Sequence, residues 1–260
     1  MLPVALTIAG SDPSGGAGVQ ADLKTFQRHG AYGTGVVTLL TVQDTTAVHR
    51  VDAIDAELVA EQLDALLADV PPAAAKCGAL GSAAIAAVVA ERLVGRQLPL
   101  VVDPVRIATH GSTLLARAAR EVLLERLLPA AALVTPNAQE AAWLSGEPVE
   151  DQAGVERAAR RLLDTGVGAV MITGGHVPGP DAVDLLWTAE GPQRLSAPRV
   201  AGRFHGLGCA LSAAITARLA CGESLPAACA AAKRWLHAAM LRGLRPGAGL
   251  QVIDHTAPVD

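Results

Sequence analysis

Aromatic residues are nearly absent from this chain: phenylalanine, tryptophan and tyrosine together make up 2% of its 260 residues. Proteins that bind single-stranded nucleic acid stack the bases on exposed aromatic rings, so this composition argues against that function. The 21 basic and 25 acidic residues are scattered along the sequence and give a net charge of −4. The sequence therefore has no basic stripe for nucleic acid and no polybasic patch for a membrane surface. We expect a small molecule as the partner.

Signatures of membrane insertion and of metal binding by cysteine are also lacking. The apolar run near the N-terminus stops at Ser11-Asp12, which makes it too short for a secretory signal. Other apolar stretches fall short of the roughly 20 residues that a membrane span needs. The four cysteines show no Cys-x-x-Cys spacing, which is typical of free thiols in a reducing compartment. We therefore expect a cytoplasmic protein.

The sequence does contain a regular alternation of two kinds of segment. Apolar runs of strand length alternate with longer segments of helical periodicity, and 51% of the residues are hydrophobic. This alternation predicts a single α/β domain over 1–260, with helices on both faces of a mostly parallel sheet. The predicted strands are 5–9, 35–41, 74–77, 100–103, 133–136, 169–173 and 183–187, with a hairpin return over 191–200. The predicted helices are 17–29, 56–69, 82–94, 113–128, 138–145, 151–164, 209–220 and 225–244.

Two glycine-rich segments each lead into a predicted helix. The first is Ser11-Asp12-Pro13-Ser14-Gly15-Gly16-Ala17-Gly18, and the second is Gly206-Leu207-Gly208-Cys209. Glycines let successive backbone N–H groups point into one space, and a helix N-terminus adds its positive dipole end, so such a turn can hold an anion. The first segment does not fit the dinucleotide fingerprint, and no Walker A sequence occurs. A tight turn packed on the sheet is the alternative interpretation of the second segment.

Polar residues gather where the predicted strands end. Ligands bind at the carboxyl ends of strands in open α/β sheets, so a shared pocket is predicted there. A lone Asp or Asn at such a position can equally cap a helix or a turn. We expect Cys209 to be acidic, because a helix N-terminus lowers the pKa of a thiol. The polar set is Asp12, Gln43, Lys76, Asp103, Asn137, Glu140 and Thr173, followed by Gly174-Gly175-His176.

These segments, in this order, resemble the hydroxymethylpyrimidine/phosphomethylpyrimidine kinases of thiamine biosynthesis, members of the ribokinase-like superfamily. The resemblance rests on residues 6–25, Val102-Asp103-Pro104-Val105, Thr135-Pro136-Asn137 with Glu140, Gly174-Gly175-His176, and 205–214. It implies a three-layer α/β/α fold and transfer of the γ-phosphate of ATP to 4-amino-5-hydroxymethyl-2-methylpyrimidine and then to its monophosphate. It also implies ATP and Mg²⁺ as cofactors and a homodimer as the assembly.

The resemblance also assigns roles to residues of this chain. The positions that match the substrate pocket are Gly10, Asp22, Val42, Gln43 and Ala79, of which Gln43 matches the glutamine that reads the pyrimidine edge. The positions that match nucleotide binding are Asn137, Thr173, Gly175 and Leu207. Cys209 matches the proposed catalytic base and lies in an anion turn with Gly206 and Gly208. The acidic positions associated with magnesium are Asp103 and Glu140, and His176 and His205 are assigned turn-shaping or lid roles.

Several residues depart from the family pattern in the region that handles charge. Leu207 replaces a usual threonine, Thr173 replaces a usual lysine, and Arg106 stands where a small uncharged residue is usual. One hypothesis makes Arg106 catalytic, as the substitute for the missing lysine. The other is a weakened paralogue that binds a pyrimidine without efficient phosphorylation. Ala79, at a position often held by methionine, leaves room for a bulkier ring, so a pyridoxal kinase is the alternative enzyme.

Overall fold

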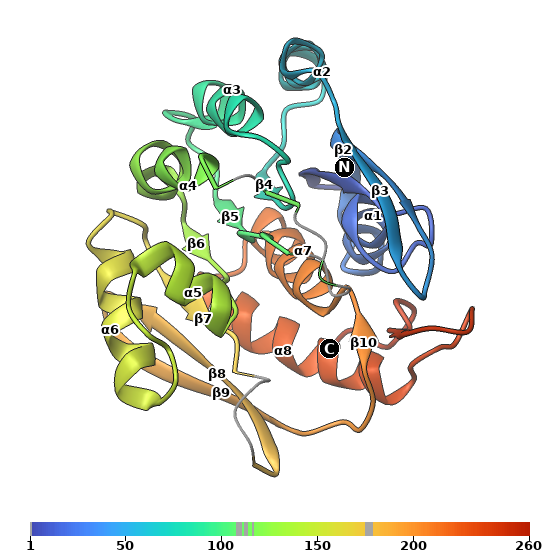
Figure 1. Ribbon diagram of the computed structural model, residues 1–260, viewed down its shortest axis with the longest axis vertical. Coiled ribbons are helices and arrows are strands. Elements are labelled where there is room, and N and C mark those ends of the chain that lie inside the picture. Colours follow the sequence, from blue (N-terminus) through green and yellow to red (C-terminus); the bar gives the residue numbers. More distant parts are fainter. Residues whose placement is uncertain (1, 108–110, 112–113, 116, 175–178) are drawn as a thin grey trace.

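The protein is built on one large sheet with helices on both faces (Figure 1). The computed structural model describes residues 2–107, 111, 114–115, 117–174 and 179–260. Within these ranges the sheet has nine strands. In sheet order they are β3 (Val48–Ala53), β2 (Tyr32–Gln43), β1 (Val4–Ser11), β4 (Ala74–Cys77), β5 (Leu100–Val102), β6 (Leu133–Val134), β7 (Val170–Ile172), β8 (Asp181–Thr188) and β9 (Gly191–Pro198).

The strands from β2 to β7 pair in parallel, and the pairs β2–β3, β7–β8 and β8–β9 are antiparallel. Helices α1 (Gly18–Arg28), α7 (Leu207–Ala220) and α8 (Leu225–Leu241) cover one face. The other face carries α2 (Ala56–Asp69), α3 (Ala83–Leu93), α4 (Ala119–Val122), α5 (Ala138–Ser145) and α6 (Gln152–Leu163). The predicted three-layer, mostly parallel α/β fold is therefore confirmed.

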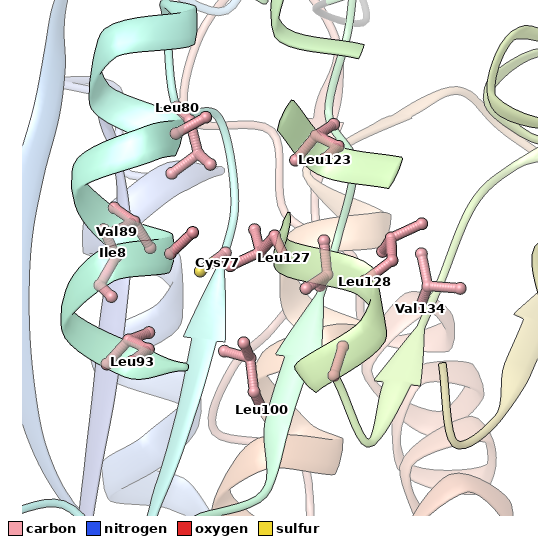
Figure 2. Close-up of a cluster of buried hydrophobic side chains, with 14 of the residues drawn as sticks. Ile8, Cys77, Leu80, Val89, Leu93, Leu100, Leu123, Leu127, Leu128 and Val134 are labelled. Atoms are coloured by element: carbon pink, nitrogen blue, oxygen red, sulfur yellow. The ribbon is translucent and has the colours of Figure 1, made fainter. Parts of the chain in front are cut away.

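Side chains alternate along each central strand and so build two cores. In β5, Leu100 and Val102 pack into the core under α2 to α6, whereas Val101 packs into the core under α7 and α8. Figure 2 shows the first core, where Val89 of α3 and Leu127 pack over the strands. The period of two follows from strand geometry, in which successive Cβ atoms point to opposite faces. This packing holds the carboxyl ends of the strands in register.

The helix predicted over 113–128 is largely wrong. Helix α4 begins only at Ala119, and the chain then tightens through a π-helical turn, Leu123–Leu127, and a 3₁₀ turn, Leu128–Ala130. Pro129 explains the end of regular α-helix, because proline lacks an N–H and its ring clashes with the preceding turn. By contrast, β4, α2 and α5 have the predicted bounds.

Three short strands were missed by the prediction. Strand β3 exposes Arg50 and Asp52 at the edge of the sheet and so lacks a strong apolar pattern. Strands β10 (Phe204–His205) and β11 (Gln251–Val252) form a separate two-stranded parallel pair. That pair joins the second glycine-rich segment to the C-terminal region. In the described part of the chain, no helix is long and apolar enough to cross a bilayer.

A buried polar cluster lies where α1 ends and packs against α8 and the C-terminal region. His29 stacks edge-on against Trp235 with ring centroids 4.7 Å apart, and both of its ring nitrogens lack a hydrogen-bond partner among the described residues. Burial lowers the pKa of His29 to about 3, with help from the charge of Arg218. Burial also lowers the pKa of His255 to about 4. Both histidines are therefore neutral in the folded protein at neutral pH.

We expect the free energy of unfolding to fall as the pH drops below 6.5, the ordinary pKa of histidine. The unfolded chain then takes up protons that folded His29 and His255 exclude, which costs about 2 kcal/mol per histidine at about pH 5. Urea unfolding at neutral and mildly acidic pH measures the difference. The variant His29→Phe keeps a ring on Trp235 and should lose roughly half of the pH dependence. If the free energy of unfolding of this variant keeps the same pH dependence, His29 does not contribute to that dependence.

Candidate active site

The carboxyl ends of the parallel strands open onto a cavity of about 390 Å³. Its walls come from the ends of β1, β2 and β5 to β7 and from both glycine-rich segments, with β8, β9 and α8 on the far side. This is the edge of the sheet at which ligand binding is expected in open α/β folds. The pocket predicted from the strand-end residues therefore exists in the structure.

Asp12 organises the first glycine-rich segment. Its carboxylate accepts hydrogen bonds from the backbone N–H groups of Ser14, Gly16 and Ala17 and from the hydroxyl of Ser14. Burial would raise the pKa of Asp12, but hydrogen bonds from His205 and Ser14 outweigh it, so the net pKa lies below its ordinary value. An ionised Asp12 thus holds the loop in one shape ahead of α1.

The two glycine-rich segments pack directly against each other. Gly206 adopts φ 78°, and a Cβ there would clash with the carbonyl oxygen of Gly16. Gly18 has φ 58°, and a Cβ there would clash with the carbonyl oxygen of Gly10. Only glycine combines a positive φ with so close a backbone approach. The glycines therefore permit the convergence of the two loops, which are about 190 residues apart in sequence.

Two helix N-termini converge at Cys209. Helix α7 begins at Leu207, so the N–H groups of Leu207, Gly208 and Cys209 have no acceptor within the helix. Helix α1 begins at Gly18, whose backbone N–H donates to the sulfur of Cys209. The dipoles of both helices place positive potential at this end of the cavity. Such a site favours a negatively charged group.

Lys76 adds a full positive charge beneath this point. Its side chain is fully buried, and its Nζ lies 2.6 Å from Asp22 Oδ1 and 3.4 Å from the carbonyl oxygen of Cys209. Thr7 donates its hydroxyl to the second oxygen of Asp22 at 2.6 Å. Burial alone would lower the pKa of Lys76, but the charge of Asp22 raises it above the ordinary value. The ammonium group is therefore charged.

The expectation of an acidic Cys209 is wrong. Burial raises the pKa of its thiol to about 12, against the lowering effect of Lys76, and the negative charge of Asp103 raises it further. The helix N-terminus is in place, but desolvation of the thiolate outweighs it. Cys209 is consequently a thiol at neutral pH.

We expect Cys209 to react slowly with iodoacetamide at neutral pH, because the thiolate is the nucleophile and is scarcely populated. Cys221 is exposed and is the internal comparison within the same protein. Peptide mass spectrometry after timed alkylation gives the order of reaction, with Cys221 modified first. Faster modification of Cys209 would restore the original expectation.

Asp103, directly after β5, and Glu140, in the first turn of α5, both line the cavity. Burial raises the pKa of Asp103 to about 6. Burial, together with the negative charge of Asp103, raises the pKa of Glu140 to about 8. Glu140 also forms a capping box with Asn137, each side chain accepting the other's backbone N–H at 3.0 Å. Asn137 therefore caps helix α5 and also lies in the cavity wall.

Comparison with known proteins identifies the family. The phosphomethylpyrimidine kinase family model matches residues 12–254. A hydroxymethylpyrimidine/phosphomethylpyrimidine kinase of Synechococcus elongatus is 44% identical over 260 residues, which is 99% of each chain. This chain belongs to the phosphomethylpyrimidine kinase family. It is accordingly a phosphotransferase, as its sequence resemblance predicts.

Solved structures show the same fold in related kinases. The pyridoxal kinase of Staphylococcus aureus in complex with ADP has a TM-score of 0.91 at 33% identity, covering 99% of this chain and 94% of its own. A phosphomethylpyrimidine kinase of Clostridium difficile has a TM-score of 0.79 at 37% identity, covering 90% of this chain and 97% of its own. The ribokinase-like fold is thereby confirmed, and the bound ADP in the first relative supports the use of ATP.

Most of the predicted site residues of this kinase meet at the cavity. Besides Asp103 and Glu140, the cavity is lined by Gly10, Gln43, Ala79, Asn137, Thr173, Gly206, Leu207, Gly208 and Cys209. Gly175 lies outside the described residues. Asp22 and Val42 are not in the wall: Asp22 is buried beneath it with Lys76, and Val42 is 56% exposed on β2. Their assignment to the substrate site stays a prediction.

Arg106 also does not face the cavity. Its guanidinium lies over the ring of Trp143, 5.5 Å from the ring centroid, while its backbone N–H donates to Glu140. A cation stacked on an aromatic ring is stabilised there. This position gives no support to the hypothesis that Arg106 replaces the missing lysine in front of the triphosphate, which stays a prediction.

Sequence reasoning missed an ion pair in the cavity wall. Lys233 of α8 binds Asp184 of β8 at 2.8 Å, and Asp184 also accepts the backbone N–H of Gly174 at 3.0 Å. Both residues of the pair line the cavity. A lone lysine in an alanine-rich helix carries no motif, so only its neighbours in space reveal it. The pair therefore holds the backbone N–H of Gly174.

Proposed function

We propose that this chain transfers the γ-phosphate of ATP to the hydroxymethyl group of 4-amino-5-hydroxymethyl-2-methylpyrimidine and then to its monophosphate, in thiamine biosynthesis. The observation that carries this proposal is the convergence of two helix N-termini and two glycine-rich loops at Cys209, inside one cavity that also contains Gln43. An anion site beside an amide that can read an aminopyrimidine suits both substrates of such a kinase.

The chain's contribution to the reaction is positioning and charge stabilisation. Phosphoryl transfer passes through a loose transition state in most analyses, so little depends on a strong base. The N–H groups of Leu207, Gly208 and Cys209 would face the oxygens of the transferring group, and Lys76 supports them from below. Cys209 contacts the substrate hydroxyl in this proposal. As a thiol, Cys209 does not take up the proton of that hydroxyl; in a loose transition state the proton can pass to an oxygen of the transferred phosphoryl group.

Asp103 and Glu140 fit a magnesium ion. Each carboxyl is buried. The charge of Lys76 acts on Asp103 against this burial, whereas the negative charge of Asp103 raises the pKa of Glu140. Mg²⁺ prefers such oxygen ligands and usually binds through one or two carboxylates together with substrate phosphates. Bound there with ATP, the ion would neutralise phosphate charge. A homodimer, which the resemblance implies, stays a prediction.

Pyridoxal is the second candidate substrate. The cavity wall has the small side chain of Ala79 at a position often occupied by methionine in the family, which leaves space for a larger ring. The similarity to the Staphylococcus aureus pyridoxal kinase, at a TM-score of 0.91, also favours this reading. Both compounds present a hydroxymethyl group on an aromatic ring, so one phosphate site can serve either.

A coupled assay for ADP, run separately with the hydroxymethylpyrimidine, its monophosphate and pyridoxal, tests the proposal. We expect ADP from the first two compounds. The variant Ala79→Met is the matched control: it should reduce turnover of pyridoxal more than turnover of the pyrimidine. Binding of the pyrimidine without ADP release would instead identify a weakened paralogue. Absence of both binding and turnover would contradict the proposed function.

A further inference from the structure

Gln43 and His205 meet inside the cavity with Asp12. The atom placed as the amide nitrogen of Gln43 lies 2.8 Å from His205 Nε2, and the same ring nitrogen lies 2.9 Å from Asp12 Oδ2. The three residues come from the end of β2, from β10 and from the loop after β1, and all line the cavity. A single ring nitrogen thus contacts both a carboxylate and an amide.

The charge of Asp12 decides where the proton of His205 lies. The Asp12 carboxylate accepts three backbone N–H groups and one hydroxyl, as an ionised carboxylate does. A bare Nε2 lone pair facing a carboxylate oxygen at 2.9 Å would be repelled by it. Nε2 therefore carries a hydrogen and donates to Asp12. Gly16 leaves room for the ring, since a Cβ there would collide with Cδ2 of His205.

That hydrogen also decides how the amide of Gln43 is turned. The oxygen and nitrogen of an amide have nearly the same shape, so their positions follow from the hydrogen bonds around them. The one hydrogen on Nε2 is donated to Asp12, so this nitrogen has no lone pair to accept an N–H from Gln43. An NH₂ group facing it would be repelled, whereas the carbonyl oxygen of the amide would be attracted. The oxygen therefore faces His205, and the NH₂ group is left to face the substrate.

We propose that His205 is a positioning residue, which orients Gln43 so that the cavity presents an N–H donor to a ring nitrogen of the substrate. The inference rests on the proposed function, because the ring nitrogen belongs to the aminopyrimidine. The amide oxygen, shared with His205, accepts from the amino group beside that nitrogen. Discrimination between substrates then depends on a hydrogen-bond acceptor in the substrate ring. A ring C–H at this point would leave the buried NH₂ donor of Gln43 unpaired.

The tautomer of His205 can be measured without any turnover. Long-range ¹H–¹⁵N correlation spectra of protein labelled with ¹⁵N-histidine separate protonated from bare ring nitrogens, and the signal missing from His205→Leu identifies His205. We expect a hydrogen on Nε2. A bare Nε2 would overturn the proposal, because the Gln43 nitrogen would then face the ring. An inactive kinase would leave this result intact, so the two proposals fail separately.

The second measurement is a discrimination ratio. We compare kcat/KM for the hydroxymethylpyrimidine with that for an analogue in which C–H replaces the ring nitrogen next to the amino-bearing carbon. The unaltered protein should prefer the pyrimidine roughly tenfold or more, the effect of an unpaired buried donor. His205→Leu and Gln43→Glu should each lose this preference. The exposed-histidine variant His49→Gln should keep it, and a full preference in His205→Leu would refute the positioning role.

Discussion

The substitution Lys76→Met is expected to lower the free energy of unfolding by about 3–5 kcal/mol, the usual cost of removing one partner of a buried ion pair. Both side chains of the Lys76–Asp22 pair are 0% exposed, and their contact is 2.6 Å long. Without the ammonium group, the Asp22 carboxylate would stay buried with only the hydroxyl of Thr7 as a donor. Methionine keeps most of the lysine volume, so the loss of charge dominates the effect.

The double variant Lys76→Met/Asp22→Asn separates charge from packing. It removes both charges and keeps an acceptor for Thr7, so most of the lost stability should return. Arg50→Met is the control for an ion pair in water: Arg50 and Asp52 are 2.8 Å apart but both are exposed, so the expected loss is below about 1 kcal/mol. Urea unfolding of the four proteins gives the comparison. A loss in Lys76→Met no greater than that in Arg50→Met would contradict the importance of the buried pair.

Gly206→Ala is expected to reduce turnover by a factor of about 100 or more. The new Cβ would collide with the Gly16 carbonyl, so the first turn of α7 must move away from the other glycine-rich loop. A shift on the order of 1 Å at a reacting group costs about 10²-fold in rate. The backbone N–H groups of Gly208 and Cys209 would then miss the transferring phosphate.

The control for this variant is Gly222→Ala, at the other end of α7. Gly222 has φ 87°, and nothing lies within 4 Å of a Cβ built there. Both substitutions therefore strain the backbone by about 1–2 kcal/mol, but only Gly206→Ala pushes the loops apart. Steady-state ADP release, compared with unfolding by urea, separates the two effects. Equal turnover in both variants would show that the contact between the loops does not matter for catalysis.

The sequence predicted the fold well because local signals and long-range packing agree in most of it. Central strands such as β4 and helices such as α2 have strong apolar patterns, and their bounds match the prediction. The region around α4 failed, since its residues are apolar enough for a helix while Pro129 and its contacts enforce a tighter turn. Strand β3 was missed because pairing with β2, rather than its own polar composition, makes it a strand.

The site was predicted in its composition but not in its electrostatics. The glycine-rich segments, Gln43, Asp103 and Glu140 could be located from their order in the chain and from the family resemblance. Their pKa values could not, because desolvation depends on neighbours that fold around each group. Cys209 shows this most clearly: its place at the start of α7 was foreseen, and its burial reverses the expected acidity.

The amino-acid sequence by itself determined the family, most of the order of strands and helices, and many of the residues at the carboxyl edge of the sheet, because these follow from local periodicity and from motifs. Only the tertiary structure decided that Lys76 lies charged beneath Cys209, that Arg106 stacks on Trp143, and that His205 meets Gln43. Side-chain direction and burial arise from contacts between segments far apart in the chain. No pattern within one segment carries that information.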